Sequence, residues 1–342
     1  MKSLILKEPG EEPDLQVVDA PEPILVPDGV IIKVAAAGVC HHDISVMDGT
    51  LRRGTKKNVV LGHEISGIVV DTGAEVSDIR IGEKVVTTLT SSCGICSKCI
   101  DGNDYMCEVA LGYGHGIDGG FAEYVMMKSH NVVKVGDLDL VQSALLSCPI
   151  GVNVKAILDV ASLSEDDTCV VFGSSGGLGI HAMQIMQNFS NNVIGFTSSP
   201  SKLDEFDQYG IASVFLLEEG FPPSELVMAL TDDKGASLVF NPIGTNFLEN
   251  SIDCLGYAGK VLLMGELSKK DVVFRSSSLL FKNGMIMGST GANRSHIQSA
   301  AEMVNSGELV PVVGGEFSFG EVLEAFHSMK TSSSIGRLVL VP

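Results

Sequence analysis

Two different hydrophobic patterns meet near residue 148 of the chain. Before that point, short apolar runs alternate with Gly, Asp and Pro; the runs are GVIIKVAAAG, VVLGHEISGIVV, GEKVVTTLT, FAEYVMM and NVVKV. Runs of this length bounded by turn residues are typical of β-strands, and helical periodicity is sparse in this region. We therefore expect residues 1–147 to form an irregular, barrel-like, β-rich domain.

After residue 148 the pattern changes to a strand followed by a helix. TCVVFG precedes GLGIHAMQIMQNF, NNVIGFT precedes SPSKLDEFDQYG, ASLVFNPIG precedes TNFLENSIDCLG, and KVLLMGE is a further strand. This alternation predicts a parallel sheet with helices on both faces. Beyond residue 290 we expect two helices, SHIQSAAEMVNSG and FGEVLEAFHSMK, and a last strand, GRLVLVP. The predicted fold class is α/β.

Length and charge exclude several kinds of protein. A chain of 342 residues exceeds one ordinary core, so two domains are expected. The formal net charge is −19 and no basic stripe stands out, which argues against nucleic acid as a partner. No uninterrupted apolar run reaches about 18 residues, and the N-terminus lacks the pattern of a signal peptide. We expect a cytoplasmic protein without a membrane segment.

Half of the eight cysteines lie in one stretch, CGICSKCIDGNDYMC, at positions 93, 96, 99 and 107. A disulfide knot and a bound metal are the two interpretations of such a cluster. Thiols stay reduced in the cytosol, so a metal is favoured. Cys169 and Cys254 lie in apolar strand or helix contexts and are expected in the core.

A glycine-rich turn follows the first strand of the predicted parallel sheet. The stretch CVVFGSSGGLG places Gly173, Gly176, Gly177 and Gly179 between a strand and a helix, with Ser174 where a strict GxGxxG has its first glycine. Such a turn lets backbone amides approach a pyrophosphate at the N-terminus of the helix. A purely structural turn is the alternative, but the surrounding strand and helix pattern favours dinucleotide binding.

The end of the next strand bears on the choice of cofactor. An NAD-specific site usually presents Asp or Glu to the ribose hydroxyls there, whereas this chain offers Thr197, Ser198, Ser199, Ser201 and Lys202. Hydroxyl donors and a cation suit a 2′-phosphate, so we predict NADP(H) over NAD(H). A polar turn that tolerates either cofactor is the alternative.

Three further fragments carry potential metal ligands at distant positions. They are GVCHHD with Cys40, GHE with His63 and Glu64, and LSCP with Cys148. A lone Cys is more often a core residue than a ligand, and the same holds for a lone His. Together, one imidazole and two thiolates would leave a fourth zinc position open for water or substrate, as a catalytic zinc requires.

With these fragments, the chain resembles the zinc-dependent medium-chain dehydrogenase/reductase family, of the alcohol dehydrogenase type, over nearly its full length. The markers are GVCHHD, LGHE, the four-cysteine stretch, GGFAEY, LSCP, GSSGGLG and GRLVLVP. The resemblance implies a GroES-like β-rich catalytic domain, residues 1–147 completed by 291–342, and a Rossmann doubly wound parallel-sheet domain, residues 148–290. It also implies a homodimer or homotetramer.

The resemblance implies roles for single residues as well. Cys40, His63 and Cys148 correspond to catalytic zinc ligands, Glu64 to a carboxylate that binds the metal transiently, and Asp43 to the partner of the zinc-bound imidazole. The four clustered cysteines have the family's spacing for a structural zinc, which makes two zinc ions per chain. The structural zinc ligands are Cys93, Cys96, Cys99 and Cys107, and the expected cofactor contacts are His41, Ser174, Ser175, Gly176, Gly177, Leu178, Thr197, Ser198, Lys202, Gly265 and Arg337.

The implied reaction is hydride transfer between nicotinamide C4 and a carbonyl carbon polarised by zinc. A short aldehyde or semialdehyde is the candidate small-molecule substrate, and NADPH favours the direction of reduction. His42 stands where the family commonly has Ser or Thr, and it either delivers a proton or shapes the pocket. Ser45 takes the place of the relay histidine of some members.

Two other functions stay open at this point. One is NADPH-dependent reduction of an activated alkene, such as an enoyl thioester of the acryloyl-CoA type, or of a quinone. The other is non-catalytic NADPH binding, since a fold alone does not establish an activity. Arg52 and Arg53 lie near enough in sequence to the predicted site to suit a semialdehyde acid.

Overall fold

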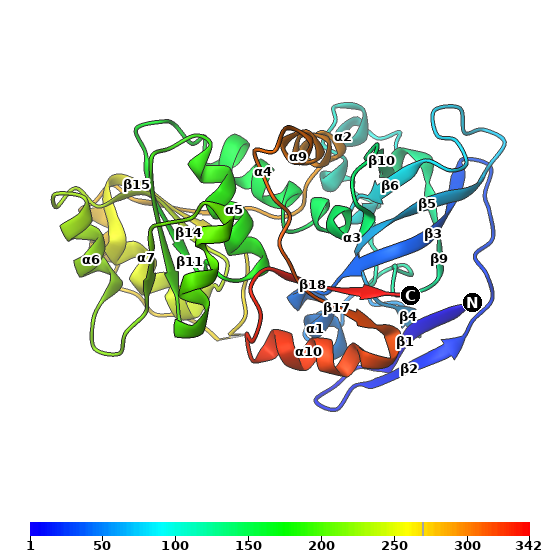
Figure 1. The fold of residues 1–342 in the computed structure, drawn as a ribbon, viewed down its shortest axis with the longest axis horizontal. Helices are drawn as coiled ribbons and strands as arrows, with labels where there is room; N and C mark the ends of the chain where they lie inside the picture. Colours follow the sequence, from blue (N-terminus) through cyan, green and yellow to red (C-terminus); the bar gives the residue numbers. More distant parts are fainter. Residues whose placement is uncertain (269) are drawn as a thin grey trace. The chain divides into compact units, whose positions relative to one another are not determined.

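The computed structural model describes residues 1–268 and 270–342 and contains two compact units. The first unit comprises Met1–Gly151, Gly291–Asn305 and Val313–Pro342, and the second comprises Val152–Thr290 and Ser306–Val312. Each unit has its own sheet and its own buried apolar core (Figure 1). The C-terminal part of the chain therefore contributes to both units.

A seven-stranded sheet forms the centre of the first unit. Its strand order is β10-β6-β5-β3-β18-β17, and β9 also pairs with β3. β17 and β18 are parallel, and the other pairs are antiparallel. The strands are β3 Gly29–Gly38, β5 Glu64–Thr72, β6 Lys84–Thr87, β9 Tyr124–Lys128, β10 Val132–Lys134, β17 Val313–Ser318 and β18 Arg337–Val341.

Shorter elements complete the first unit. The additional strands are β1 Lys2–Glu8, β2 Asp14–Asp19, β4 Val59–Val60, β7 Thr90–Ser91 and β8 Leu111–Gly112. The α-helices are α1 His41–Met47, α2 Ser97–Ile100, α3 Leu140–Ser143, α9 Arg294–Ser306 and α10 Val322–Lys330. The 3₁₀ turns are η1 Asp104–Met106, η2 Ser129–Asn131, η3 Ala144–Leu146 and η8 Phe319–Glu321.

The strand GVIIKVAAAG illustrates why this sheet forms. Val30, Ile32 and Val34 alternate along β3 and are buried in one apolar cluster with Ile65 of β5. Farther along the strand, Ala37 is buried in a different cluster, together with residues of α10. Because successive side chains of a strand point to opposite faces, β3 is buried on both sides and belongs at the centre of the sheet.

The second unit is built on a six-stranded parallel sheet of order β13-β12-β11-β14-β15-β16. Its first strand along the chain, β11, lies next to β14, where the order of the strands reverses. In open sheets of this kind, ligands bind at the carboxyl ends of the strands beside that reversal. The strands are β11 Thr168–Phe172, β12 Asn192–Thr197, β13 Val214–Leu216, β14 Ala236–Asn241, β15 Leu255–Leu263 and β16 Met285–Gly288.

Helices cover this parallel sheet, and α5 and α7 lie beside β11 and β14 in Figure 1. Phe172 of β11 and Val239 of β14 share a buried cluster with Leu248 and Ile252 of α7. The helices are α4 Gly151–Val154 with the π-helix η4 Lys155–Val160, α5 Gly177–Gln187, α6 Pro223–Leu230, α7 Leu248–Cys254 and α8 Ser276–Leu280. The 3₁₀ turns are η5 Pro200–Glu205, η6 Asp207–Tyr209 and η7 Thr245–Phe247. The predicted α/β fold class is confirmed.

Several elements differ from the sequence prediction. The segment SPSKLDEFDQYG, predicted as a helix, forms the two 3₁₀ turns η5 and η6, which meet at Phe206; Pro200 begins the first turn and Gly210, in the left-handed conformation, caps the second. The run VVLGHEISGIVV, predicted as one strand, forms β4 and β5 separated by residues 61–63. Four further elements were not predicted, namely β13, β16, β17 and α6. The three strands are short and carry few alternating apolar residues.

The segment 306–312 also departs from the prediction that 291–342 completes the first domain. Side chains of α5 hold the backbone of this segment in the second unit. The carboxamide of Gln184 bonds both the N–H of Val310 at 2.8 Å and its carbonyl at 3.0 Å. His181 Nε2 accepts from Val312 N–H at 2.9 Å, and Asn188 donates to Glu308 O at 3.0 Å. Hydrogen bonds from His181, Gln184 and Asn188, which are spaced along one face of α5 and its C-cap, therefore hold residues 306–312 in the second unit.

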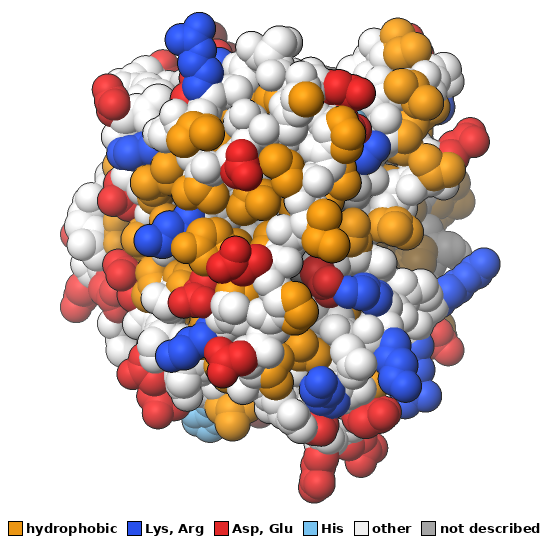
Figure 2. All heavy atoms as spheres, turned by 90° about the vertical axis from the view of Figure 1, so that its right-hand side faces the viewer, with side chains coloured by type: hydrophobic (Ala, Val, Ile, Leu, Met, Phe, Trp, Pro, Cys, Tyr) orange, Lys and Arg blue, Asp and Glu red, His pale blue; other side chains and the backbone are white. Residues whose placement is uncertain are grey.

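One helical stretch, Leu140–Val160, has the length and mean hydropathy of a membrane span, but 78% of that window is buried inside the protein. Polar residues such as Asn153 and Lys155 interrupt it. Such burial is typical of a core helix. Figure 2 shows one face of the molecule, on which coloured acidic, basic and hydrophobic side chains are interspersed.

Candidate functional site

Four potential metal ligands gather in the first unit, namely Cys40, His63, Glu64 and Cys148. One ligand atom from each residue lies within 4.8 Å of those of the others. The donors are two sulfurs, one imidazole nitrogen and one carboxylate oxygen. The fragments GVCHHD, GHE and LSCP, which are distant in sequence, are therefore brought together by the fold.

The central strands of the sheet place three of these groups. Gly38 of β3 pairs with Glu64 of β5, Cys40 follows β3 as the N-cap of α1, and His63 directly precedes β5. A Cβ atom on Gly38 would lie 2.0 Å from Glu64 Oε2. Only glycine at position 38 therefore lets the Glu64 side chain cross its neighbouring strand.

A hydrogen-bonded helical stretch presents Cys148. Cys148 follows η3, which packs against β3 and β5. Ser147 Oγ donates to Thr87 O of β6 at 2.6 Å, and Ser66 of β5 donates to Leu140 O. These two bonds fasten the stretch that precedes Cys148 to the sheet at both of its ends.

The loop that contains GGFAEY fixes the backbone before His63. Gly62 has φ +91°, and a Cβ on Gly119 would lie 1.9 Å from Gly62 O. Phe121 N–H donates to Leu61 O at 2.8 Å, and Gly120 N–H donates to Gly62 O at 2.9 Å. This close approach of two backbones requires small residues on both sides, which explains the glycines in both fragments.

Asp43 of α1 orients the first two ligands. Its Oδ2 accepts from Cys40 N–H at 2.9 Å, and its Oδ1 lies 3.4 Å from His63 Nδ1. Burial opposes a positive charge on His63, but Asp43 and Cys40 together raise the pKa of His63 well above its usual value. Without a metal, this raised pKa favours protons on both ring nitrogens; a bound metal ion would replace the proton on Nε2, while Asp43 would keep the proton on Nδ1.

Arg337 of β18 lies against Glu64. Its Nη2 is 3.1 Å from Glu64 Oε1, its Nη1 donates to Val39 O at 3.3 Å, and the side chain is 6% exposed. Burial raises the pKa of Glu64 to about 7 although Arg337 lowers it. The guanidinium is thus part of the charge balance of this cluster, and its expected role at the cofactor phosphates stays a prediction.

The half-buried thiols of Cys40 and Cys148 differ in their pKa shifts. A hydrogen bond from Cys148, followed by the charges of Arg337 and His63, lowers the pKa of Cys40 well below its usual value despite burial. A thiolate is the form of cysteine that binds metal. The hydrogen bond to Cys40 and burial raise the pKa of Cys148 well above its usual value, so the thiolate form is favoured at Cys40 alone.

Three further imidazoles lie at or beside the cluster. The ring of His42 is 4.9 Å from that of His63 and 5.6 Å from that of His115. Burial, and then the charge of His63, lowers the pKa of His42 to about 4. Burial also lowers the pKa of His41. His115 was not singled out from the sequence, where its place in the glycine-rich stretch LGYGHG was the available signal.

The buried polar atoms fit a metal ion at this cluster. Glu64 Oε2 is buried and has no hydrogen-bond partner among the residues described, whereas Glu64 Oε1 lies 3.1 Å from Arg337 Nη2. Sulfur and imidazole nitrogen are the donors that zinc prefers in proteins. The donor set therefore suits zinc, and three of the four donors are the set of a catalytic site.

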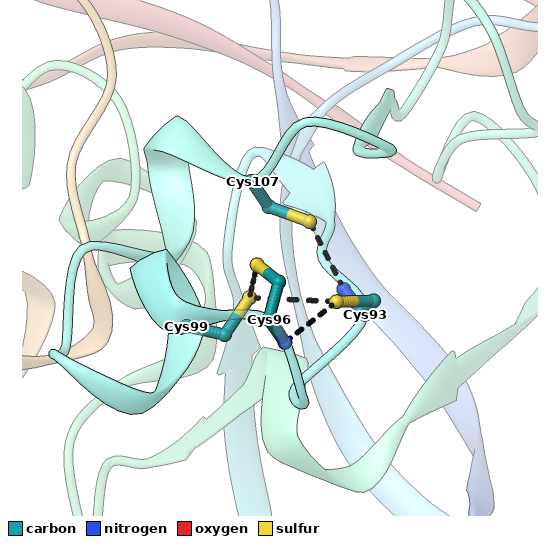
Figure 3. A group of neighbouring side chains, drawn as sticks. All are labelled: Cys93, Cys96, Cys99 and Cys107. Atoms are coloured by element: carbon teal, nitrogen blue, oxygen red, sulfur yellow. Dashed lines mark hydrogen bonds between the residues drawn. The ribbon is translucent and has the colours of Figure 1, made fainter.

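The four cysteines of the other cluster also lie together (Figure 3). Their sulfurs are all within 4.8 Å of one another, and those of Cys96 and Cys99 are 3.5 Å apart. Backbone N–H groups donate to two of the sulfurs, from Cys93 to Cys107 at 3.4 Å and from Cys96 to Cys93 at 3.3 Å. Such amides, from Ile95 and Cys96, lower the pKa of Cys93 to about 6. All eight cysteines of the described chain are free thiols, so the metal interpretation fits better than a disulfide knot.

The glycine-rich turn of the second unit has the geometry of a dinucleotide site. Gly173 has φ +59°, and Gly176 is the N-cap of α5. A Cβ on Gly179 would lie 2.2 Å from Gly173 O, so the helix packs directly on the turn. Ser174 Oγ is buried without a hydrogen-bond partner among the described residues. Free amides at the helix N-terminus and this hydroxyl fit the phosphates of a nicotinamide cofactor.

The expected cofactor residues are distributed around this turn. Ser175 Oγ lies 3.2 Å from Thr197 Oγ1 at the end of β12, and Thr197 Oγ1 accepts from Ser199 N–H at 3.2 Å. Ser198 is exposed, whereas Lys202 is buried, and burial lowers its pKa. Gly265 follows β15, where its Cβ position lies 2.4 Å from Pro242 O. Gly177 and Leu178 form the first turn of α5.

Two family models match the chain. One, described as alcohol dehydrogenase GroES-like domain, matches residues 26–137, and the other, described as zinc-binding dehydrogenase, matches residues 177–306. The first range includes Cys40, His63 and the four clustered cysteines. The second includes the whole of α5 and the strands β12, β13, β14, β15 and β16.

Individual proteins are similar over the whole chain. An acryloyl-coenzyme A reductase of Sulfurisphaera tokodaii is 28% identical over 344 residues, with all of both chains covered. An NAD-dependent alcohol dehydrogenase of the same organism is 30% identical over 355 residues, again with both chains fully covered. The crystal structure of an alcohol dehydrogenase from Aeropyrum pernix has a TM-score of 0.92 and 25% identity, and 100% of each chain is covered.

Proposed function

Because this chain belongs to the zinc-dependent medium-chain dehydrogenase/reductase family, we propose that it transfers a hydride between NADP(H) and the carbon of a small aldehyde or alcohol. It is a zinc-containing, NAD(P)-dependent oxidoreductase of the alcohol dehydrogenase type. The NADP(H) preference, the aldehyde substrate and the count of two zinc ions per chain are the parts that we propose. A non-catalytic binding protein would have no use for the mixed ligand set.

The proposal is carried by one observation, the convergence of Cys40, His63 and Cys148 with Glu64 beside them. These residues would hold the catalytic zinc, and Cys93, Cys96, Cys99 and Cys107 would hold the structural one. Four thiolates satisfy a tetrahedral zinc completely, whereas two thiolates and an imidazole leave room for a further ligand. The two clusters in one unit therefore suit two different tasks.

Each residue near the catalytic cluster has a separate task in this proposal. Zinc at this place supplies Lewis acidity to a carbonyl oxygen, and the nicotinamide supplies or accepts the hydride. Asp43 keeps the His63 imidazole in one orientation, and Arg337 offsets the negative charge of Glu64. His42 lies half-buried beside His63, and because its pKa is lowered to about 4, its neutral imidazole would act as the base that takes the proton from the substrate hydroxyl in alcohol oxidation and would return it in the reverse direction.

Replacing His42 with alanine is expected to lower kcat at least about tenfold with little change in KM, because general acid–base catalysis contributes at least that much. Ser45→Ala in the same helix is the matched control and should leave kcat unchanged. Steady-state rates with a short aldehyde and NADPH check this. A His42→Ala variant with the kcat of the wild type would assign His42 to pocket shape alone.

An NADP(H) preference is proposed from the end of β12, where Thr197, Ser198 and Ser199 present no carboxylate. Thr197→Asp is expected to lower kcat/KM for NADPH by about tenfold or more, because a carboxylate there repels the 2′-phosphate, and to improve NADH relatively. Thr197→Ser, which keeps the hydroxyl bonded to Ser199 N–H, is the control. A wild-type enzyme that uses NADH better than NADPH would contradict the proposed preference.

A second candidate reaction is favoured by the full-length likeness to an acryloyl-coenzyme A reductase. It is the reduction of an enoyl thioester with the same cofactor. Oxidation of NADPH should be followed with short aldehydes and with enoyl thioesters, before and after metal removal. Aldehyde turnover that disappears with the metal supports the proposal. Alkene reduction that survives metal removal would replace it with the second candidate.

A homodimer or homotetramer in the cytoplasm is also proposed. The strand β16 is the edge of the parallel sheet, and it carries unpaired backbone groups along one side. Exposed apolar side chains lie close to it in the sequence, with Leu280 at 68%, Phe281 at 81% and Met285 at 44% exposure. Light scattering should give at least twice the chain mass of 36.1 kDa. A mass of one chain at all concentrations would refute the oligomer.

A further inference from the structure

A cationic loop lies next to the candidate metal cluster. The loop, residues 51–58 with the sequence LRRGTKKN, joins α1 to β4. It contains four basic residues and no acidic one, although the whole chain has 42 acidic and only 23 basic residues. The loop is therefore positively charged, whereas the chain as a whole has a formal net charge of −19.

Contacts tie this loop to the cluster. His115 Nε2 lies 3.0 Å from Leu51 O, and Lys56 N–H donates to His115 O at 2.8 Å. The ring of His115 is 5.6 Å from that of His42, which in turn is 4.9 Å from that of His63. The loop is therefore connected to His63, a proposed metal ligand, through His115 and His42.

The four cations of the loop are not equivalent. Lys56 forms an ion pair with Asp118, whose other oxygen accepts from Val60 N–H at 3.0 Å, so Lys56 anchors the loop. Arg52, Arg53 and Lys57 are exposed and form no ion pair with a carboxylate in the described part of the chain. The loop is therefore held in place by one cation and leaves three without counter-charge.

We propose that Arg52 and Arg53 bind an anionic group, a carboxylate or a phosphate, that the substrate carries away from its reacting carbon. This rests on the proposed function and narrows its substrate to an anionic carbonyl compound. Guanidinium groups bind both anions in a planar, two-pronged geometry. Their position beside the cluster, in a chain of net charge −19, provides local attraction for a substrate that the rest of the surface repels.

Matched substrates test the inference. Succinic semialdehyde is compared with its neutral methyl ester, and glyceraldehyde 3-phosphate with glyceraldehyde, so that the two pairs distinguish carboxylate from phosphate. For at least one pair, the wild type should prefer the anionic member in kcat/KM, and the double variant Arg52→Gln with Arg53→Gln should lose about tenfold through KM. Activity with the neutral members should stay unchanged. Arg80→Gln, which removes another exposed arginine of the first unit, is the control for the loss of a surface charge away from the loop.

A binding measurement separates this inference from the proposed reaction. Calorimetric titration with unreactive succinate and with inorganic phosphate needs no turnover. The double variant should bind one of the two anions about tenfold more weakly than the wild type and the Arg80→Gln control, and added salt should weaken wild-type binding. Equal affinity in all three proteins, no measurable binding of either anion, or equal loss of anionic and neutral activity would overturn the inference. If the wild type bound one of the anions but reduced none of the aldehydes, the proposed reaction alone would be overturned.

Discussion

Replacing Cys148 with alanine is expected to lower kcat/KM for aldehyde reduction by on the order of a thousandfold. Loss of one thiolate from a site with three strong donors leaves Cys40 and His63 with a metal that is weakly held or absent. Lewis-acid polarisation contributes several kcal/mol to such reactions, and each 1.4 kcal/mol corresponds to a factor of about ten in rate. Rates should be measured together with zinc content, which should fall from two ions per chain towards one.

A buried cysteine outside the cluster provides the control for this experiment. Cys254→Ala changes a fully buried thiol in the core of the second unit. It is expected to reduce stability slightly and to keep both zinc ions and the rate. A Cys148→Ala enzyme with wild-type activity and two zinc ions would remove Cys148 from the metal site.

Replacing Cys99 with serine is expected to release the other zinc ion and to lower the melting temperature by on the order of 10 °C. The segment 93–107 has few regular elements, the four-residue helix α2 and the 3₁₀ turn η1. Ile95 and Ile100 are 82% and 74% exposed, so little apolar burial orders the segment. We therefore expect metal binding by the four thiolates to supply much of the stability of this segment.

A substitution in the same helix that spares the four sulfurs provides the control for Cys99→Ser. Ser97→Ala lies in the same helix, exposed and outside the four sulfurs, and should keep zinc content and melting temperature. Thermal unfolding with metal analysis of both variants checks the expectation. If Cys99→Ser unfolded at the wild-type temperature with two zinc ions bound, the cysteine cluster would not be a metal site.

Much of the fold could be predicted from the sequence because its pattern changes at one place. In β3, GVIIKVAAAG, apolar residues alternate because one face of the strand is buried in an apolar cluster. From β11 onward, apolar strands are followed by helices because a parallel sheet is covered by helices. The strands β16 and β17 could not be predicted in this way. Their sequences, MIMG and VGGEFS, are short, and pairing with β15 and β18 orders them.

The candidate metal cluster could be assembled from the sequence only with the help of a family resemblance. Nothing local brings Cys40 and Cys148 together; the pairing of β3 with β5 and the bonds from Ser147 and Ser66 do. The ion pair of Arg337 with Glu64 was not foreseen for the same reason, because it also joins residues that are distant in sequence. Long-range contacts of this kind leave no periodic signal in the chain.

The most direct test of the account is a crystal structure with anomalous diffraction recorded on both sides of the zinc absorption edge. We predict one peak about 2.0–2.3 Å from Cys40 Sγ, Cys148 Sγ and His63 Nε2, and a second one among the four clustered cysteines. A crystal grown with zinc that shows the second peak and none at Cys40, His63 and Cys148 would mean that these three residues do not form a metal site.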